Sequence, residues 1–303
     1  MSEHASPAAS IAAYSRRALD MPLEGPAQLV VTAALGTAHL VGAFEPWSGE
    51  TEDGIPAFRR GTGGATVTLH PGDVYLGLSL RDPAALVACD APRLLNRYVR
   101  PLLRALSTFG TKASYFGRDW VSAGKRPVAA VVFGYDEVSQ RSLVEAFVGV
   151  DAPFADRPWP SFAGAEAASL CELHRAACQP DDVVRAVAAA YEKDYALGCL
   201  KSVHGVAELL SPEASYLASV EEAMGPVGVR FVDGRLHVAG IFMSSRDAVR
   251  RLDASLTTLR RDAPPDLVAG VVDAAFAGPE AALFGVRSLH SFRDAIVAAA
   301  RAR

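Results

Sequence analysis

The sequence is poor in cysteine, and this scarcity argues against a fold held together by disulfide bonds. Its 303 residues include four cysteines, at Cys89, Cys171, Cys178 and Cys199, and we expect all of them to be reduced, as in a cytoplasmic protein. Cys171, His174 and Cys178 are spaced so that a helix would place them on one face, as in a zinc site, but no fourth ligand is obvious. We therefore predict no disulfide and no metal site.

Long apolar runs and an excess of positive charge are also missing. No run approaches the roughly 20 apolar residues that cross a bilayer, and the first residues lack the basic and apolar segments of a secretory signal. The net charge is −4, with both signs mixed along the chain, which gives no broad cationic face for a phosphate backbone. These absences predict a cytoplasmic protein that interacts with neither a membrane nor nucleic acid.

Apolar residues are abundant enough to form a large core. They make up 50% of the chain, against 21% charged residues, which is typical of a globular protein rather than a disordered one. Because 303 residues exceed the usual size of a single core, we predict two domains. The first positions, within residues 1–24, mix Ala, Ser and Pro, and we expect this segment to be mobile and without function.

The pattern over residues 25–225 predicts a large unit in which strands and helices are mixed. Short apolar runs separated by Gly, Pro and Asp predict strands from Gln28 to Leu80 and again between about residues 113 and 150. Three- and four-residue spacing predicts a helix over Pro92–Leu106 that Pro101 kinks or restarts. Two further helices are expected, one from Asp181 and one from Ser211.

A smaller α+β unit is predicted over residues 226–303, with the boundary near Gly225. Asp233-Gly234 stands between two apolar runs and suits a two-residue hairpin turn. After the hairpin, apolar residues recur at helical spacing from Val249 onward. A hairpin followed by helices fits a separate domain of about 80 residues.

The residues best suited to chemistry surround a glycine-rich stretch, Arg59-Arg60-Gly61-Thr62-Gly63-Gly64. Glycines let backbone N–H groups approach an anion closely, and the two arginines add positive charge, so the stretch predicts a phosphate- or carboxylate-binding loop. Neither the Walker pattern nor the dinucleotide fingerprint fits, because no Gly-Lys-Ser/Thr follows and the next residues predict a strand. The alternative is an ordinary glycine-rich turn with solvated arginines.

This stretch resembles the Arg-Arg-x-Ser-Gly-Gly-Gly-x-Val-x-His-x-x-Gly loop of the lipoate protein ligases. The matching positions are Arg59, Arg60, Thr62, Gly63, Gly64, Val67, His70 and Gly72, whereas Ala65 replaces the third glycine. A second block, Tyr115–Ala129, resembles the family's Gly-Arg-Asn-Asp-Leu-Val strand and the lysine strand after it. In this block Lys125 is the candidate for the catalytic lysine, and a shift of one residue would give that position to Arg126.

The resemblance implies an α+β fold: a class II synthetase-like biotin/lipoate ligase catalytic domain, with a mixed sheet flanked by helices, followed by a small α+β accessory domain. It implies an ATP-dependent ligase that activates lipoate or a related medium-chain acid as an acyl-adenylate, with Mg²⁺ accompanying the ATP. The acceptor would be a lysine of the lipoyl carrier domain of a 2-oxoacid dehydrogenase or glycine-cleavage protein. Positioned cations and N–H groups would stabilise the charge that gathers at the α-phosphate.

The same resemblance assigns roles to individual residues. It makes Lys125 catalytic and gives substrate or nucleotide binding to Arg59, Arg60, Gly61, Thr62, Gly63, Gly64, Ala65, His70, Gly117 and Asp119. Two other functions stay open at this stage. Ala65 and Arg126-Pro127 motivate a non-catalytic paralogue that binds a lipoyl, acyl or nucleotide ligand. An ATP-independent octanoyl or lipoyl transferase would keep the fold, although a cysteine nucleophile is lacking near Ser114.

Overall fold

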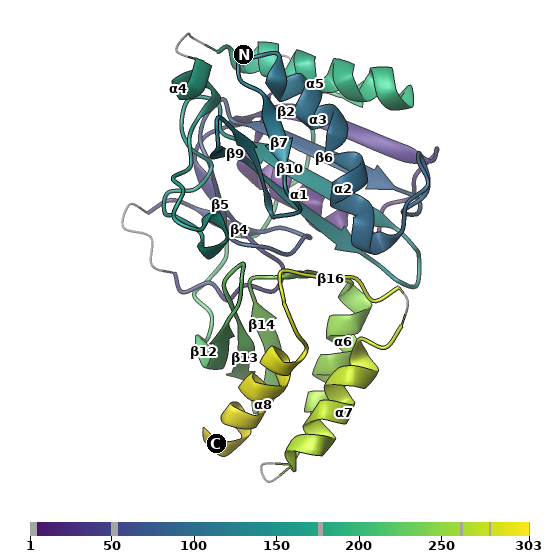
Figure 1. The fold of residues 1–303 in the computed structure, drawn as a ribbon, viewed down its shortest axis with the longest axis vertical. Helices are drawn as coiled ribbons and strands as arrows, with labels where there is room; N and C mark the ends of the chain where they lie inside the picture. The colour runs from purple at the N-terminus through teal and green to yellow at the C-terminus, as the bar shows by residue number, and fades with distance from the viewer. Residues whose placement is uncertain (1–4, 50–53, 175–177, 261–262, 279, 303) are drawn as a thin grey trace.

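The chain folds into two units stacked along its long axis (Figure 1). The computed structural model describes all residues except 1–4, 50–53, 175–177, 261–262, 279 and 303. The described strands of the larger unit form an eight-stranded mixed sheet in the order β1-β2-β6-β10-β9-β8-β7, with β11 pairing with β2. Their bounds are β1 Ala5–Pro7, β2 Ala27–Leu35, β6 Val74–Leu80, β7 Ala113–Tyr115, β8 Trp120–Ala123, β9 Arg126–Tyr135, β10 Ser142–Val148 and β11 Cys199–Leu200.

The middle of this sheet is buried on both faces, because its strands are nearly continuous apolar runs. Every residue of β6 and β10 is buried, and so is β9 after Arg126. Glu145 is the one charged residue of β10, and it lies opposite Gly77 of β6 and Val132 of β9. The register therefore places a carboxyl group in the centre of the core.

Helices cover this sheet, and the larger unit also contains a second, smaller sheet. In the larger unit, the helices are α1 Ala8–Arg17, α2 Leu94–Tyr98, α3 Arg100–Ser107, α4 Leu170–His174 and α5 Pro180–Tyr195, with 3₁₀ turns at Ala91–Arg93 and Pro160–Phe162. The ring of Tyr14 in α1 lies edge-on to that of Tyr75 in β6. The smaller sheet has the order β4-β3-β5, with bounds Ala57–Arg59, Ala38–Val41 and Val67–Leu69. The glycine-rich stretch is the connection between β4 and β5.

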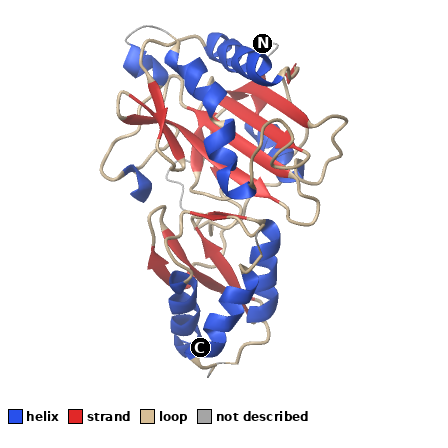
Figure 2. Cartoon of the chain, turned by 45° about the vertical axis from the view of Figure 1, so that its right-hand side comes forward, coloured by secondary structure: helices blue, strands red, loops and turns tan. Residues whose placement is uncertain are grey.

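The smaller unit is an antiparallel sheet of β12 (Tyr216–Glu221), β13 (Pro226–Val232) and β14 (Arg235–Gly240) packed against helices (Figures 1 and 2). The helices are α6 Arg246–Leu256, α7 Pro265–Ala275 and α8 His290–Ala302. Between the two units lies a short pair, β15 Met243–Ser244 and β16 Leu283–Phe284. The amide of Phe133 in β9 donates to Met243 Sδ, so this pair connects the smaller unit to the central sheet.

Most of the predicted elements are confirmed. The α+β class, the mixed sheet flanked by helices and the small α+β unit are all present. Pro101 lies in the first turn of α3 and restarts the helix that began as α2. Asp233 and Gly234 have φ angles of 48° and 81°, as a two-residue hairpin turn between β13 and β14 requires. No helix in the described part of the chain is both long and apolar enough to span a membrane.

Three expectations differ from the structure. From Ala5 onward the N-terminal segment is packed rather than free: β1 pairs with β2, and Ile11 in α1 is fully buried. No helix begins at Ser211, because the chain runs on irregularly into β12. Because β12 pairs with β13, the sheet of the smaller unit extends upstream of the predicted boundary near Gly225.

Candidate functional site

The glycine loop, residues 61–65, packs against the chain's own backbone. A Cβ atom on Gly61 would lie 2.3 Å from Ser15 O, and one on Gly63 would lie 2.2 Å from Phe242 O. Gly64, at φ +90°, donates its N–H to Phe242 O at 2.9 Å. The sequence predicted that these glycines allow an anion to approach the backbone; the groups that approach here belong to α1 and to the smaller unit.

Arg60 holds the same loop from within the core. Its guanidinium donates to the carbonyl oxygens of Leu40, Gly63 and Ala65 at 2.6, 2.7 and 2.9 Å. Burial lowers its pKa to about 10, against the opposing effect of the nearby Glu145 carboxyl group. Arg60 thus stabilises the shape of the loop and does not face a ligand. One of its acceptors is the carbonyl oxygen of Ala65, the residue that departs from the family pattern.

Arg59 connects the loop to the smaller unit. It donates to Gly42 O at 2.6 Å, to Glu45 O at 2.7 Å and to Glu213 Oε2 at 2.7 Å. The same Glu213 oxygen lies 2.8 Å from Arg230 NH1 in β13. Glu213 thus bridges one arginine from each unit, and Arg59 serves as an interdomain contact in this conformation.

His70 lies at the end of β5, away from the glycine loop. Its ring nitrogen Nε2 is 3.5 Å from Asp156 Oδ1, and its backbone N–H donates to Asp73 Oδ2 at 2.8 Å. Burial raises the pKa of Asp73 to about 7. These partners of His70, to which the resemblance assigns a binding role, lie outside the glycine loop.

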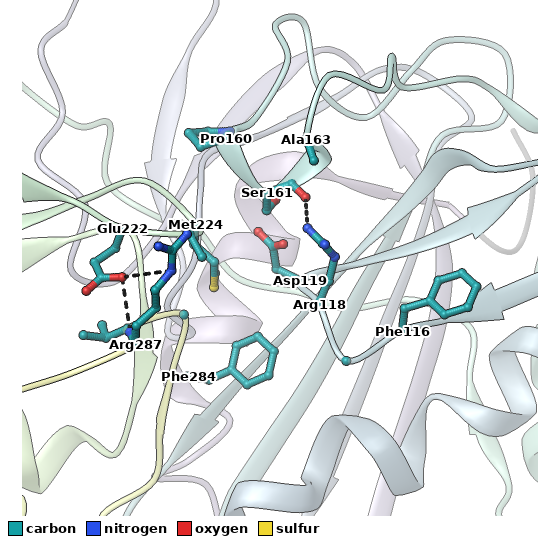
Figure 3. Close-up of a pocket in the computed structure, with 14 residues that line it drawn as sticks. Phe116, Arg118, Asp119, Pro160, Ser161, Ala163, Glu222, Met224, Phe284 and Arg287 are labelled. Carbon is teal, nitrogen blue, oxygen red and sulfur yellow. Dashed lines mark hydrogen bonds and ion pairs between the residues drawn. The ribbon is translucent and has the colours of Figure 1, made fainter.

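The main cavity lies where the two units meet, with a volume of about 650 Å³ (Figure 3). This volume is within the range of small-molecule sites, which are mostly apolar with a few placed polar groups. The larger unit contributes Phe116, Gly117, Arg118, Asp119, Pro160, Ser161 and Ala163, and the smaller unit contributes Glu222, Ala223, Met224, Phe284, Gly285, Val286 and Arg287. Met224 connects the cavity to the glycine loop, because its Cε would lie 3.8 Å from a Cβ on Gly64.

Asp119 is the most unusual polar group of this cavity. It is fully buried just before β8, where its carbonyl oxygen accepts from Val131 N. In the described part of the chain, neither of its carboxyl oxygens nor the hydroxyl group of the neighbouring Ser161 forms a hydrogen bond of good geometry, although the Ser161 hydroxyl group is near enough to lower the pKa of the Asp119 carboxyl group. Burial raises the pKa of Asp119 to about 6. Buried, unpaired polar groups are rare in proteins and mark candidate ligand sites.

Two guanidinium groups lie at the sides of the cavity, one from each unit (Figure 3). Arg118 donates from NH1 to Ser161 O at 2.7 Å, and its guanidinium carbon lies 6.0 Å from the centre of the Trp120 ring. Arg287 is 80% exposed, and its Nε is 4.0 Å from Glu222 Oε2. Both are free to turn toward an anion, because each forms few contacts with the rest of the chain.

Lys125 lies elsewhere. Gly124 and Lys125 form the two-residue turn between β8 and β9, and both have positive φ angles. The glycine loop instead contacts β9 at Val132, whose Cγ1 would be 2.9 Å from a Cβ on Gly64. Lys125 and Val132 are seven positions apart along the strand, or roughly 23 Å at about 3.3 Å per residue. The structure does not bring Lys125 to the loop, and β9 itself contains no lysine.

The described residues provide no ready-made metal site. No group of three His, Cys, Asp or Glu side chains gathers in a way that could hold an ion. At the cavity, Glu222 is already engaged by Arg287 and Ser291, which leaves only Asp119. A single carboxyl group provides too few ligands to bind a metal ion without substrate, so Mg²⁺ would bind together with the phosphates of a nucleotide.

The sequence reasoning identified Gly117 and Asp119, which line the cavity, and missed Glu145, Ser161 and Arg287. Glu145 had a visible signal, because an acidic residue interrupts an otherwise apolar strand run. Ser161 and Arg287 had none, since they lie in irregular segments and reach the cavity only through the contact between the units.

Solved structures with this arrangement are known. Plasmodium falciparum LipL1, determined in complex with lipoate, aligns with a TM-score of 0.62 over 97% of this chain and 98% of its own, at 12% identity. Lipoate-protein ligase A bound with ATP aligns with a TM-score of 0.50 over 66% of this chain and 87% of its own, at 13% identity. The chain has the fold of the lipoate–protein ligases.

A further solved structure aligns with about two thirds of this chain. The bipartite lipoate protein ligase of Thermoplasma acidophilum aligns over 67% of this chain and 88% of its own, with a TM-score of 0.50 and 12% identity. The alignment to LipL1 covers 97% of this chain and so includes the smaller unit. No protein-family model and no curated protein matches the sequence. The shared property is thus the lipoate-ligase fold, including its C-terminal unit.

Proposed function

We propose that this protein is an ATP-dependent acyl–protein ligase that activates lipoate or a related medium-chain acid and transfers it to a lysine of a lipoyl carrier domain. The observation that carries this proposal is the interdomain cavity, which Met224 connects to the glycine loop and which is lined by apolar side chains, two arginines and the carboxyl groups of Asp119 and Glu222. The proposal is supported by a fold shared with a lipoate-bound ligase over almost the whole chain.

The cavity residues suit both halves of such a reaction. Phe116, Met224 and Phe284 offer an apolar lining for an acyl chain. When the acid's carboxylate attacks the α-phosphorus of ATP, pyrophosphate leaves and negative charge gathers on the phosphate oxygens. Arg118 and Arg287 would stabilise that charge from the two sides, because positioned cations act most strongly where water is excluded. Mg²⁺, carried by the nucleotide, would neutralise the phosphates.

The second half-reaction needs an amine and a protected adenylate. The nitrogen of the acceptor lysine attacks the acyl carbon, the bond from that carbon to the phosphate oxygen breaks, and AMP leaves. Burial between two units shields the reactive anhydride from water until the amine arrives. In this scheme the catalytic cation is not Lys125. Seven positions along the strand separate Lys125 from Val132, where β9 contacts the loop.

A second candidate, a binding protein without ligase activity, is favoured by one observation. Gly61 N–H donates to Ser15 Oγ and Gly64 N–H to Phe242 O, so two donors of the loop are occupied by this chain. If the units never separate, the loop cannot bind a nucleotide, and the cavity would hold an acyl ligand alone.

Pyrophosphate release from Mg·ATP separates these functions. We would measure it with lipoate, octanoate and biotin in turn, for the natural protein and for Arg118→Ala, Lys125→Ala and the exposed-surface control Arg185→Ala. We expect release that depends on one acid, falls about 100-fold in Arg118→Ala and is unchanged in the other two. The absence of release with every acid, from folded protein that still binds an acid, would favour the binding protein. Acid transfer between carriers without ATP would indicate the transferase.

A further inference from the structure

A second pocket lies on the larger unit beside the first, with a volume of about 330 Å³. It is formed by β7, β8 and the turn before β9. Lys112 and Lys125 lie at its sides, and the hydroxyl-bearing residues Thr111, Ser114 and Ser122 line it. Its two lysines make it cationic although its lining surface is mostly apolar, whereas the cavity between the units is lined by polar and apolar surface in similar measure.

The charge of this pocket is opposite to that of the protein as a whole. The chain has a net charge of −4 and only four lysines, at Lys112, Lys125, Lys193 and Lys201. Two of the four meet here, and none of the lining residues is acidic. Among the residues that the structure describes, neither ammonium group takes part in an ion pair, whereas the adjacent Arg126 is paired with Glu172.

The backbone at Lys125 gives a second, independent reason to expect a role for this side chain. Lys125 has φ 71°, a left-handed conformation that costs a non-glycine residue roughly 1–2 kcal/mol. Glycine or asparagine is the usual choice at such a turn position. A lysine kept there is held at the tip of a rigid hairpin, with its ammonium group presented to solvent beside the pocket.

The pocket adjoins the proposed active site through one shared lining residue. Phe116 lines both the interdomain cavity and the cationic pocket, and it is 71% exposed. Aromatic side chains are enriched at protein–protein interfaces, and charged groups at the rim of an interface steer an oppositely charged partner. A small anion would satisfy the lysines but would leave the ring uncovered. A protein seated on both would have a segment within reach of the cavity.

We propose that Lys112, Lys125 and Phe116 form the docking surface for an acidic segment of the acyl-acceptor protein. This inference rests on the proposed function, because the acceptor must bring its lysine to the neighbouring cavity. The lysines attract and orient the acidic partner, and Phe116 packs against an apolar residue at the edge of the cavity. Lys125 thereby acts in recognition of the acceptor and leaves adenylate formation to the arginines.

The test uses the full-length chain, a purified unlipoylated lipoyl carrier domain, and two charge reversals. Lys112→Glu/Lys125→Glu removes the cationic pair, and Lys193→Glu/Lys201→Glu reverses the two other lysines, which are also exposed. We would measure the Kd of the carrier domain at low and high salt, and pyrophosphate release in parallel. We expect the first variant to bind about tenfold more weakly, with a flatter salt dependence. The second variant should match the natural protein, and pyrophosphate release should persist in both.

Two outcomes would overturn the inference. One is an equal Kd for the natural protein and Lys112→Glu/Lys125→Glu, or no carrier binding at all. The other is an unchanged Kd with a loss of pyrophosphate release in that variant, which would make the pocket a site for the nucleotide's phosphates. The proposed function fails separately, when the natural protein releases no pyrophosphate with any acid, whatever the carrier binding shows.

Discussion

Arg60 and Glu145, both fully buried, are joined through the hydroxyl group of Thr62. Arg60 Nε donates to Thr62 Oγ1 at 3.1 Å, and Thr62 Oγ1 donates to Glu145 Oε2. Glu145 also accepts from Ser15 Oγ at 3.0 Å and from Tyr75 OH at 2.7 Å. The carboxyl group therefore connects the central sheet, α1 and the glycine loop, and it lies near the positive charge that shapes the loop.

Glu145→Ala should destabilise the protein strongly. Removal of the carboxyl group leaves the buried hydroxyl groups of Ser15, Thr62 and Tyr75 without their acceptor and takes away one of the acidic groups near Arg60. Each buried group left without a hydrogen bond costs about 1–3 kcal/mol. Glu145→Gln keeps the size and part of the hydrogen bonding, so its cost should be smaller. Urea unfolding followed by circular dichroism would measure both, with the exposed Glu24→Ala as control. A change below 1 kcal/mol in Glu145→Ala would contradict this account of the core.

Asp119→Asn should alter how stability depends on pH. Burial raises the pKa of Asp119 from 3.8 to about 6 in the folded protein. The folded state therefore holds this proton more tightly than the unfolded state, and the penalty for ionisation grows as pH rises from about 4 to 6. Above pH 6 it reaches about 3 kcal/mol, at 1.36 kcal/mol per pKa unit. Asparagine removes this penalty.

We expect the stability difference between Asp119→Asn and the natural protein to favour the variant by about 2 kcal/mol more at pH 8 than at pH 4.5. The charged groups that face Asp119 are Arg118 and Arg60, with Tyr115 nearby, and across the cavity lie Glu222 and Arg287. The arginines keep their charge over this range. Thermal unfolding at the two pH values is the measurement, and a pH-independent difference would show that Asp119 is paired in solution.

Gly63→Ala should loosen the contact between the glycine loop and the smaller unit. The added Cβ would lie 2.2 Å from Phe242 O and 2.9 Å from Met243 Cα, which are backbone atoms that cannot move independently. Overpacking of this kind typically costs about 1–3 kcal/mol. Hydrogen exchange should become faster at the Gly64 amide, which donates to Phe242 O. The control is Gly278→Ala, where a Cβ meets nothing within 4 Å. Unchanged exchange at Gly64 would contradict the close packing of Gly63 against Phe242.

The elements that depend on nearest neighbours in the sequence were predictable. The hairpin turn at Asp233-Gly234 follows from residues that tolerate positive φ angles. The restart of a helix at Pro101 follows from the missing N–H of proline. The packing of α1 was not predictable, because its burial comes from distant partners such as Ser79, which contacts Tyr14 at 2.9 Å.

The sequence by itself determined the α+β fold class and the presence of a glycine-rich loop that allows a close backbone approach, because spacing, turn residues and glycine content act locally. Only the tertiary structure decided what that loop and its arginines contact. Arg59, Arg60 and Gly64 meet Glu213, Leu40 and Phe242, which are distant in the chain. Likewise, the register of β8 and β9 sends Lys125 to a hairpin tip and Asp119 to the cavity. A side chain's type limits its chemistry, but the strands beside it determine which partners it reaches.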